Sequence, residues 1–487
     1  MDLAKRCYEF VSSPEPVATF QKWCSIRPKP AKSEVSVTSD KQCNGNCYCD
    51  EEGKPQPKHG DTFIKSTTNS KSSSHDIVSN GHCNANGINS EYSNLKQRNG
   101  GKQNHYLENN KVGNGDINQN GTYFGKEDTL NGAPTLNGYT HTNGTKLTTE
   151  PSTGPEFIIG NYLIFAIFRL GAELGNEFFY MIFYSFTLWN FDSKICLKIV
   201  LVWVLIMYVG QSMKDVIRWP RPASPPVFQL ESRYALEYGM PSTHAMVGTA
   251  IPYCLLMFTY GRYEYSIEVG ICLAISWCTL VCFSRLYLGM HTILDILVGL
   301  LSVSILLFIL VPWAEAAVLF LVGNKYGGPI NVASALALAY FYPTLEYQKW
   351  SSARGDTTVF LGVASGLLFG SWLNCQTGLL VEEEMTFPYA RTVFEYHMIK
   401  NTMGRLVMGV IAIAVMRFIM KLFTFRTLCF IFRKDANDPK SKTCVIIEIP
   451  YKYISYFVLA FGAAYLAPQI FQYFGMDRSS YYTEIFH

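Results

Sequence analysis

The sequence predicts an all-α protein, a polytopic bundle of about eight to ten transmembrane helices that follows a disordered N-terminal tail. Three observations predict this fold class. Only 16% of the 487 residues are charged, against roughly 25% in a soluble domain. The composition changes abruptly near Pro155. From there to about residue 474, apolar stretches of near membrane-spanning length follow one another.

The charge balance narrows the class of partner. The chain carries 41 Lys and Arg residues against 38 Asp and Glu residues, a formal net charge of +3. A protein that binds nucleic acid through a strong positive field needs a clustered excess of basic residues. We therefore expect membrane lipid, and no nucleic acid, as a partner.

We assign residues 1–155 to a disordered tail. Residues 35–153 are mostly Asn, Gly, Ser, Thr and Lys, with almost no clustered aliphatic side chains. Such a segment cannot bury enough apolar surface to offset the entropy that folding removes. Residues 1–16 contain no apolar core of a secretory signal, so we expect the tail to stay in the cytosol.

Nine apolar stretches follow the tail. They cover residues 178–189, 195–209, 245–260, 267–282, 293–312, 331–342, 359–373, 406–423 and 453–471. A bilayer core about 30 Å thick needs about 20 apolar residues of helix, and several stretches are shorter than that. We divide the remaining chain into a core, residues 156–320, which holds all the motifs described next, and C-terminal transmembrane helices, residues 321–487.

Charges at or within an apolar region are costly, so each is a candidate functional residue. The first cluster follows the second apolar stretch, where Lys214 and Arg221 are separated by six residues and Pro222 comes next. A mobile ammonium and a planar guanidinium together suit an oxyanion with two negative charges. For this cluster alone, a basic anchor that flanks a membrane span is the simpler interpretation.

The second cluster is Pro241-Ser242-Thr243-His244, directly before the third stretch. Pro and Ser are typical of a helix start, and we expect Ser242 to cap the free amides of the first turn, which can hold an anion. His244 can exchange a proton near neutral pH. A capped helix with an interfacial histidine explains these four residues equally well.

The third cluster contains Ser284, Arg285, His291 and Asp295. If a helix begins near Gly289, His291 and Asp295 lie four residues apart on one helix face. The carboxylate can then accept the proton of one ring nitrogen, which leaves the other nitrogen for a substrate. The alternative is an ion pair that packs two helices together. Because two spans separate the second cluster from the third, all three clusters can meet at one membrane face.

In this order, K-x6-R-P, P-S-x-H and S-R-x5-H-x3-D resemble the three signatures of the type 2 phosphatidic acid phosphatase and vanadium haloperoxidase superfamily, across residues 214–295. The second signature usually has Gly at the position of Thr243. This variant, with the stretches 175–180, 211–222, 237–246 and 284–291, resembles the sphingosine-1-phosphate phosphatases, more loosely from residue 161 to 474.

The resemblance implies a haloperoxidase-like helical catalytic core and a lipid phosphomonoesterase. It would hydrolyse sphingosine 1-phosphate and related sphingoid-base phosphates through a phosphohistidine. His291 would be the nucleophile, Asp295 would orient it, and His244 would serve as general acid and base. A broad lipid phosphatase acting on phosphatidate, lysophosphatidate or a polyprenyl phosphate is the alternative. A transport or lipid-binding membrane protein without catalysis would need neither histidine.

The resemblance also implies how the phosphate is held. The residues expected to bind it are Lys214, Arg221, Ser242, Thr243 and Arg285. Arg218 would contact the phosphate or a carboxylate such as Asp215. We expect no metal or other cofactor, because three cations already oppose the phosphate charge and no acidic cluster lies near these motifs.

Selectivity and location complete the expectations. Glu177, with Glu173 a turn earlier, could recognise the ammonium group of a sphingoid base, although a role in helix packing is equally plausible. The resemblance implies the endoplasmic reticulum membrane, with the site facing the lumen and the N-terminal tail in the cytosol. The basic stretch 421–442 should be cytosolic as well, by the positive-inside rule.

Overall fold

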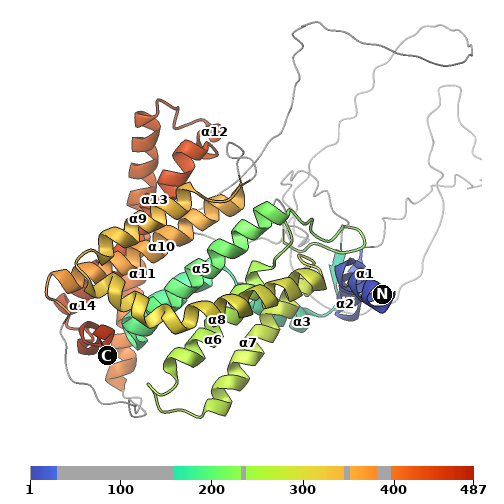
Figure 1. Ribbon diagram of the computed structural model, residues 1–487, viewed down its shortest axis with the longest axis horizontal. Helices are drawn as coiled ribbons and strands as arrows, with labels where there is room; N and C mark the ends of the chain where they lie inside the picture. The colour runs from blue at the N-terminus through green and yellow to red at the C-terminus, as the bar shows by residue number, and fades with distance from the viewer. Residues whose placement is uncertain (1, 30–156, 232–236, 345–350, 381–395, 487) are drawn as a thin grey trace, which may run out of the picture. The chain divides into compact units, whose positions relative to one another are not determined.

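The computed structural model describes residues 2–29, 157–231, 237–344, 351–380 and 396–486, and all structural statements refer to these residues. Most of them lie in helices (Figure 1), so the predicted all-α fold class is confirmed. In chain order the elements are α1 (Asp2–Ser12), α2 (Glu15–Trp23), β1 (Ile26–Pro28), β2 (Phe157–Ile159), α3 (Tyr162–Glu173), α4 (Glu177–Phe186), α5 (Ser193–Ile217), α6 (Thr243–Thr259), α7 (Ile267–Tyr287), α8 (Ile293–Gly323), α9 (Gly327–Tyr340), α10 (Ser352–Gln376), α11 (Tyr396–Ile431), α12 (Pro439–Lys442), α13 (Val445–Phe461) and α14 (Ala467–Tyr473).

Six helical segments in the described part of the chain are long and apolar enough to cross a membrane. They are α5, α7, α8, α10, the part of α11 from Met398, and the run Val445–Tyr473 that α13 and α14 form with a π turn between them. The nine predicted stretches all fall on helices, with α4, α6 and α9 being shorter. The predicted end of one stretch at residue 312 is wrong, because α8 continues through Pro312 to Gly323. This is the architecture of a multi-pass membrane protein.

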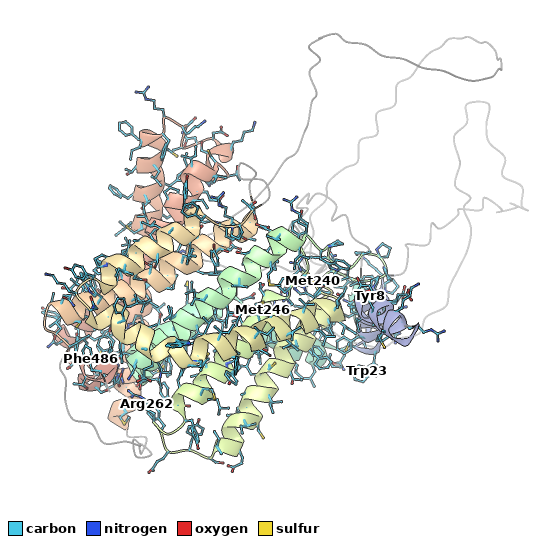
Figure 2. The ribbon with its side chains drawn as sticks, viewed as in Figure 1. Tyr8, Trp23, Met240, Met246, Arg262 and Phe486 are labelled. Atoms are coloured by element: carbon cyan, nitrogen blue, oxygen red, sulfur yellow. The ribbon has the colours of Figure 1, made fainter. Side chains whose placement is uncertain are left out.

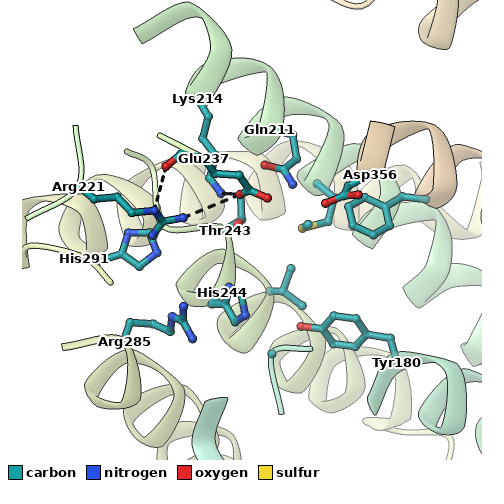
Figure 3. Close-up of a pocket in the computed structure, with 14 residues that line it drawn as sticks. Tyr180, Gln211, Lys214, Arg221, Glu237, Thr243, His244, Arg285, His291 and Asp356 are labelled. Carbon is teal, nitrogen blue, oxygen red and sulfur yellow. Dashed lines mark hydrogen bonds and ion pairs between the residues drawn. The ribbon is translucent and has the colours of Figure 1, made fainter. Parts of the chain in front are cut away.

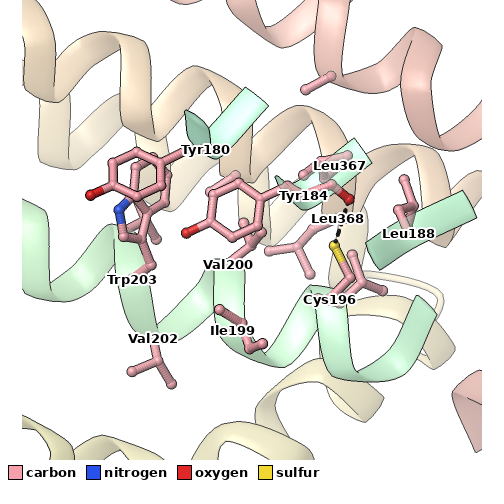
Figure 4. Close-up of a cluster of buried hydrophobic side chains, with 14 of the residues drawn as sticks. Tyr180, Tyr184, Leu188, Cys196, Ile199, Val200, Val202, Trp203, Leu367 and Leu368 are labelled. Carbon is pink, nitrogen blue, oxygen red and sulfur yellow. Dashed lines mark hydrogen bonds between the residues drawn. The ribbon is translucent and has the colours of Figure 1, made fainter. Parts of the chain in front are cut away.

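Helix α5 is enclosed by the rest of the bundle. In its apolar window 78% of the residues are buried, and it packs against α6, α8 and α10. The ring centroid of Trp203 on α5 lies 5.7 Å from that of Tyr180 and 5.3 Å from that of Tyr184 on α4 (Figure 4). Large buried rings contribute much of the apolar area in a core. Because packing holds α5 along its length, the polar residues of its last turns have defined positions.

Helix α10 is held just as closely by α13. Gly362, Gly366 and Gly370 recur every four residues on α10, and a Cβ atom at Gly366 would lie only 2.2 Å from the backbone oxygen of Phe457 on α13. Small residues at this spacing let helix backbones approach in a membrane. The first turns of α10 therefore have a fixed place beside α5.

The bundle has two ends, and the end where α5 finishes is named here the Lys214 end. α10 begins there, since the Ser351 hydroxyl donates to Asp215 Oδ2 over 2.6 Å. α6 and α8 begin there as well. At the opposite end, Asp192 precedes α5 and binds Arg262, in the loop from α6 to α7, with 2.6 Å between Oδ2 and Nε. The C-terminal Glu484 accepts from Ser193 at that same end.

Residues 2–29 correct the predicted extent of the disordered tail. The sequence assigned residues 1–155 to a disordered tail, but α1, α2 and β1 are formed, and β1 pairs antiparallel with β2. The side-chain amide of Gln21 donates to the backbone oxygens of Phe228 and Tyr287 over 2.7 and 2.9 Å. Residues 2–29 therefore pack at the Lys214 end.

The basic stretch 421–442 lies at that end too. The rings of Phe425 on α11 and Tyr451 on α13 pack with centroids 5.6 Å apart. The next residue, Lys452, lies 3.7 Å from Asp356 near the start of α10. In the described residues, this stretch and the residue 2–29 segment therefore lie at the same end of the bundle as the signature motifs.

Candidate active site

A pocket at the Lys214 end collects six of the predicted site residues. Figure 3 shows their side chains converging from separate elements. They are Lys214, Arg221, Thr243, His244, Arg285 and His291. Helix α10 also contributes to the wall through Asp356 and Phe360, so the C-terminal part of the chain helps to build the site.

Lys214 lies in the last turns of α5 and is only 2% exposed. Its Nζ atom lies 2.7 Å from Oε2 of Glu237, a buried carboxylate that the sequence analysis did not assign to the site. A buried ammonium needs such a partner, because removing it from water is costly. The pocket without substrate thus already holds one negative charge beside Lys214.

Arg221 connects two loops of the site, the one between α5 and α6 and the one between α7 and α8. Its Nε donates to the backbone oxygen of Glu237 over 2.9 Å, and Nη1 donates to that of Met290 over 2.8 Å. Burial lowers the pKa of Arg221 to about 10, with the Glu237 carboxylate acting in the opposite direction. The guanidinium is therefore still charged at neutral pH, and it holds the loop before His291 in place.

Arg285, near the end of α7, is fully buried. Its Nη2 donates to Oε2 of Glu231 over 3.0 Å, and Glu231 also accepts from Arg169 on α3. Nε and Nη1 of Arg285 have no hydrogen-bond partner among the described residues. Buried N–H groups are normally paired, so these two are donors that a bound anion can satisfy.

His291 lies in the turn between α7 and α8. The turn needs Gly289, which has a φ of +68° and no room for a side chain, since a Cβ atom would lie 2.3 Å from the backbone oxygen of Phe228. Burial and the neighbouring cations, led by Arg221 and Arg285, lower the pKa of His291 well below its usual range. The ring is therefore neutral at pH 7, as a nitrogen nucleophile must be.

His291 and Asp295 lie close together, but not because they are on one helix face, as the sequence predicted. α8 begins at Ile293 rather than near Gly289, so the two residues do not share a helix face. Asp295 instead closes a capping box, in which its Oδ2 accepts from the Thr292 N–H over 2.7 Å and its own N–H donates to Thr292 Oγ1 over 3.2 Å. Oδ2 lies 3.7 Å from His291 Nδ1, which is longer than a hydrogen bond.

His244 lies in the first turn of α6, and its orientation is set by Asn176. His244 Nε2 is 3.3 Å from Asn176 Oδ1, while Asn176 Nδ2 donates to Glu173 over 2.7 Å. Because the amide oxygen faces the ring, this contact requires the proton on Nε2. The ring also needs Gly175, since a Cβ atom there would lie 2.5 Å from His244 Cδ2.

Ser242 corrects a predicted cap. It occupies the N-cap position of α6, but its side chain makes no capping hydrogen bond. Its N–H donates to the backbone oxygen of Asp295 over 3.1 Å, which ties α6 to α8. Its buried Oγ has no hydrogen-bond partner among the described residues, whereas Thr243 lines the pocket.

The remaining candidates are not among the residues that line the pocket. Arg218 ends α5 in the left-handed conformation, and its Nε donates to the backbone oxygen of Asp215 over 3.1 Å. The Asp215 carboxylate accepts from Tyr342 and from Ser351, so it connects α5 to α10. The Glu177 side chain lies outside the described residues.

No group of three or more His, Cys, Asp or Glu side chains that could hold a metal ion occurs in the described ranges. The site instead presents buried cations. Two histidines lie among three cations, Lys214, Arg221 and Arg285, near the ends of apolar helices (Figure 3). Such a cluster suits a phosphate group at the membrane surface.

The fold and this site define a membrane phosphatase of the PAP2 superfamily, whose family model matches residues 195–318. Sphingosine-1-phosphate phosphatase 1 of Rattus norvegicus is 39% identical over 321 residues, which cover 66% of this chain and 74% of that protein. Sphingosine-1-phosphate phosphatase 2 of Mus musculus is 35% identical over 328 residues, 67% and 92% of the two chains. The protein belongs to the sphingosine-1-phosphate phosphatase family of this superfamily.

A more distant relative, lipid phosphate phosphatase delta of Arabidopsis thaliana, is 28% identical over 260 residues, which cover 51% of this chain and 60% of that protein. No solved structure matches the chain.

Proposed function

We propose that this protein hydrolyses sphingosine 1-phosphate and related sphingoid-base 1-phosphates to the sphingoid base and phosphate. The observation that carries the proposal is the convergence of Lys214, Arg221 and Arg285 with two histidines in one pocket at the end of apolar helices. A lipid phosphate has its charged group at the interface and its chain in the bilayer, so it can enter such a site without full extraction. The names of the relatives support the same substrate class.

In the first step, His291 Nε2 attacks phosphorus and the bond from phosphorus to the ester oxygen breaks. Asp295, at 3.7 Å from Nδ1 of His291, stabilises the positive charge that develops on the ring. The departing alkoxide takes a proton from Nδ1 of His244, because Nε2 of that ring is engaged by Asn176. The products of the step are the sphingoid base and a phosphohistidine.

In the second step, His244 Nδ1 takes a proton from a water molecule whose oxygen attacks phosphorus. The bond from phosphorus to His291 Nε2 breaks, and phosphate leaves with the histidine neutral again. During both steps, Lys214, Arg221 and Arg285 hold the equatorial oxygens, with the Ser242 hydroxyl and the Thr243 turn in support. Arg218 and Asp215 are outer residues that keep the end of α5 in place.

The proposed reaction needs no metal ion. Three side-chain cations oppose the phosphate charge. The Nε and Nη1 groups of Arg285, which have no partner among the described residues, can donate to the phosphate oxygens that a metal ion would otherwise bind. Activity in the presence of EDTA is therefore expected, and strong inhibition by EDTA would contradict this part of the proposal.

We further propose the endoplasmic reticulum membrane as the location, with the site facing the lumen. Since residues 2–29 pack at the Lys214 end, they would share the lumenal face with the site. The stretch 421–442 packs at this end as well, and the positive-inside rule favours the reverse orientation. Tags at the chain ends, described in the Discussion, separate the two orientations.

A broad lipid phosphate phosphatase is the second candidate, favoured by the match to the lipid phosphate phosphatase of Arabidopsis thaliana. Purified protein should be assayed for phosphate release from sphingosine 1-phosphate, lysophosphatidate, phosphatidate and a polyprenyl phosphate under identical conditions. The proposal predicts the highest kcat/KM for sphingosine 1-phosphate. Equal values across the panel would support the broad enzyme, and no release from any of them would support a non-catalytic lipid-binding or transport protein.

A further inference from the structure

The pocket has two chemically different regions, and the second is not used by the mechanism above. The cations and histidines form one region. Next to this region the pocket wall contains Gln211 and Asp356 (Figure 3). Val247 and Phe360 are apolar residues of the same lining. A pocket that offers cations to an anion, with a carboxylate and an amide oxygen nearby, fits a ligand that carries both signs of charge.

Gln211 has an unmet hydrogen-bond acceptor. It is 4% exposed, and its Oε1 atom has no hydrogen-bond partner among the described residues. An unpaired acceptor away from water is unfavourable, so such a group in a pocket indicates a ligand donor. Gln211 lies three residues before Lys214 on α5, which puts the two side chains on the same helix face within about 6 Å at Cβ.

Asp356 provides the negative charge of this region. It lies in the second turn of α10, its side chain is 25% exposed, and its Oδ1 is 3.7 Å from Lys452 Nζ. Lys452 is closer to Glu448, at 2.9 Å. A carboxylate has about four acceptor positions. Asp356 can therefore take a ligand donor in addition to its present neighbours.

The other carboxylates near the site pair with the phosphate-binding cations or with residues outside the pocket wall. Glu237 lines the pocket but lies 2.7 Å from Lys214 and 4.0 Å from Arg221, among the groups proposed to hold the phosphate. Glu173, considered from the sequence together with Glu177, accepts from Asn176 and pairs with Arg169 at 2.6 Å. Of the two described carboxylates in the pocket wall, Asp356 is the one outside the phosphate cradle.

We propose that Gln211 Oε1 and the Asp356 carboxylate form a subsite for an ammonium group next to the phosphate-bearing carbon of the substrate. A sphingoid-base phosphate carries its amine on the carbon next to the phosphate-bearing carbon, whereas a lysophosphatidate has a neutral hydroxyl or ester there. The subsite favours the zwitterionic headgroup. This inference rests on the proposed function, because it assigns the specificity of the same site.

The test compares two lipids of equal chain length, sphingosine 1-phosphate and lysophosphatidate, with purified full-length protein in the same detergent. Asp356→Asn and Gln211→Leu should each lower the ratio of kcat/KM for sphingosine 1-phosphate to that for lysophosphatidate about tenfold, mainly through KM. Glu448→Gln is the matched control, because it removes a carboxylate from the same Lys452 cluster outside the pocket wall. Its ratio should equal that of the wild type.

An unchanged kcat/KM ratio in both Asp356→Asn and Gln211→Leu would overturn the subsite. An equal fall of kcat/KM for the two lipids in both variants leaves the ratio unchanged and would overturn it too. A fall in the ratio for Glu448→Gln as large as that for Asp356→Asn would also overturn it, since the effect would then belong to the Lys452 cluster. Failure of the proposed function looks different, because the wild type itself would then not hydrolyse sphingosine 1-phosphate.

Discussion

His244 Nε2 faces Asn176 Oδ1 at 3.3 Å, and Asn176 is in turn fixed by the Glu173 carboxylate. The contact places a proton on Nε2, where it faces Asn176. In the proposed mechanism Nδ1 is then the nitrogen that gives its proton to the leaving group. An asparagine 68 residues before the histidine thereby acts as a positioning residue.

Asn176→Leu should lower kcat for sphingosine 1-phosphate by about tenfold to a hundredfold, because the general acid loses its orientation. The measurement compares this lipid with p-nitrophenyl phosphate, whose leaving group needs no proton. We expect a much smaller loss with the activated ester. Asn331→Leu, the same change at a buried asparagine that bonds Ser365 on α10, is the control for misfolding. Equal losses with both substrates would refute the positioning role.

Asp295→Asn separates the charge of Asp295 from its capping role. An asparagine can still accept from the Thr292 N–H, so α8 should keep its first turn and the thermal unfolding temperature should change little. The positive charge that develops on His291 loses its counter-charge. We expect kcat to fall about a hundredfold or more, measured beside an unfolding curve of the same preparation. Activity close to that of the wild type would mean that Asp295 is only a helix cap.

The pH dependence of kcat/KM should reflect the low pKa of His291. Because burial and the nearby cations disfavour the protonated ring, the acid limb due to His291 should lie below about pH 6.5, the usual value for histidine. Arg285→Gln removes one of these cations, so the pKa of His291 and the acid limb should move to higher pH. The substrate phosphate titrates identically for both proteins. A limb that stays in place, or moves to lower pH, would contradict the assignment.

The packing at the Lys214 end predicts the membrane topology. Epitope tags at the N-terminus, at Asn437 between α11 and α12, and at the C-terminus should be tested by protease protection in sealed microsomes. The first two tags should behave alike and the C-terminal tag oppositely, since Glu484 lies at the other end. Protection of the first two tags would support a lumenal site, and their digestion a cytosolic one. Opposite behaviour of the N-terminal and Asn437 tags would contradict the described packing.

The sequence was sufficient for the fold class and for the six residues that meet in the pocket, because each lies in a short motif and because basic side chains and histidines stand out in an apolar chain. The partners of those residues were harder to predict. Glu231, Glu237 and Asn176 are ordinary polar residues, and only the fold brings them to Arg285, Lys214 and His244.

Of two local errors, one had a signal in the sequence and the other did not. Thr292-x-x-Asp295 has the pattern of a capping box, which starts α8 after His291 rather than at Gly289. The segment 2–29 has no apolar run of membrane-spanning length and is followed by the polar stretch 35–153, so the sequence places both in one tail. Gln21 nevertheless pairs three backbone groups of Phe228 and Tyr287, and this contact between distant parts of the chain has no sequence pattern.

Whether His291 carries the phosphoryl group can be determined by trapping the intermediate. Wild type and His291→Ala should be incubated briefly with sphingosine 1-phosphate labelled with ³²P, denatured in alkali to preserve the phosphohistidine, and counted for acid-labile phosphate on the protein. We expect label on the wild type, located at His291, and neither label nor phosphate release with His291→Ala. Phosphate release by His291→Ala at the wild-type rate would contradict this role of His291.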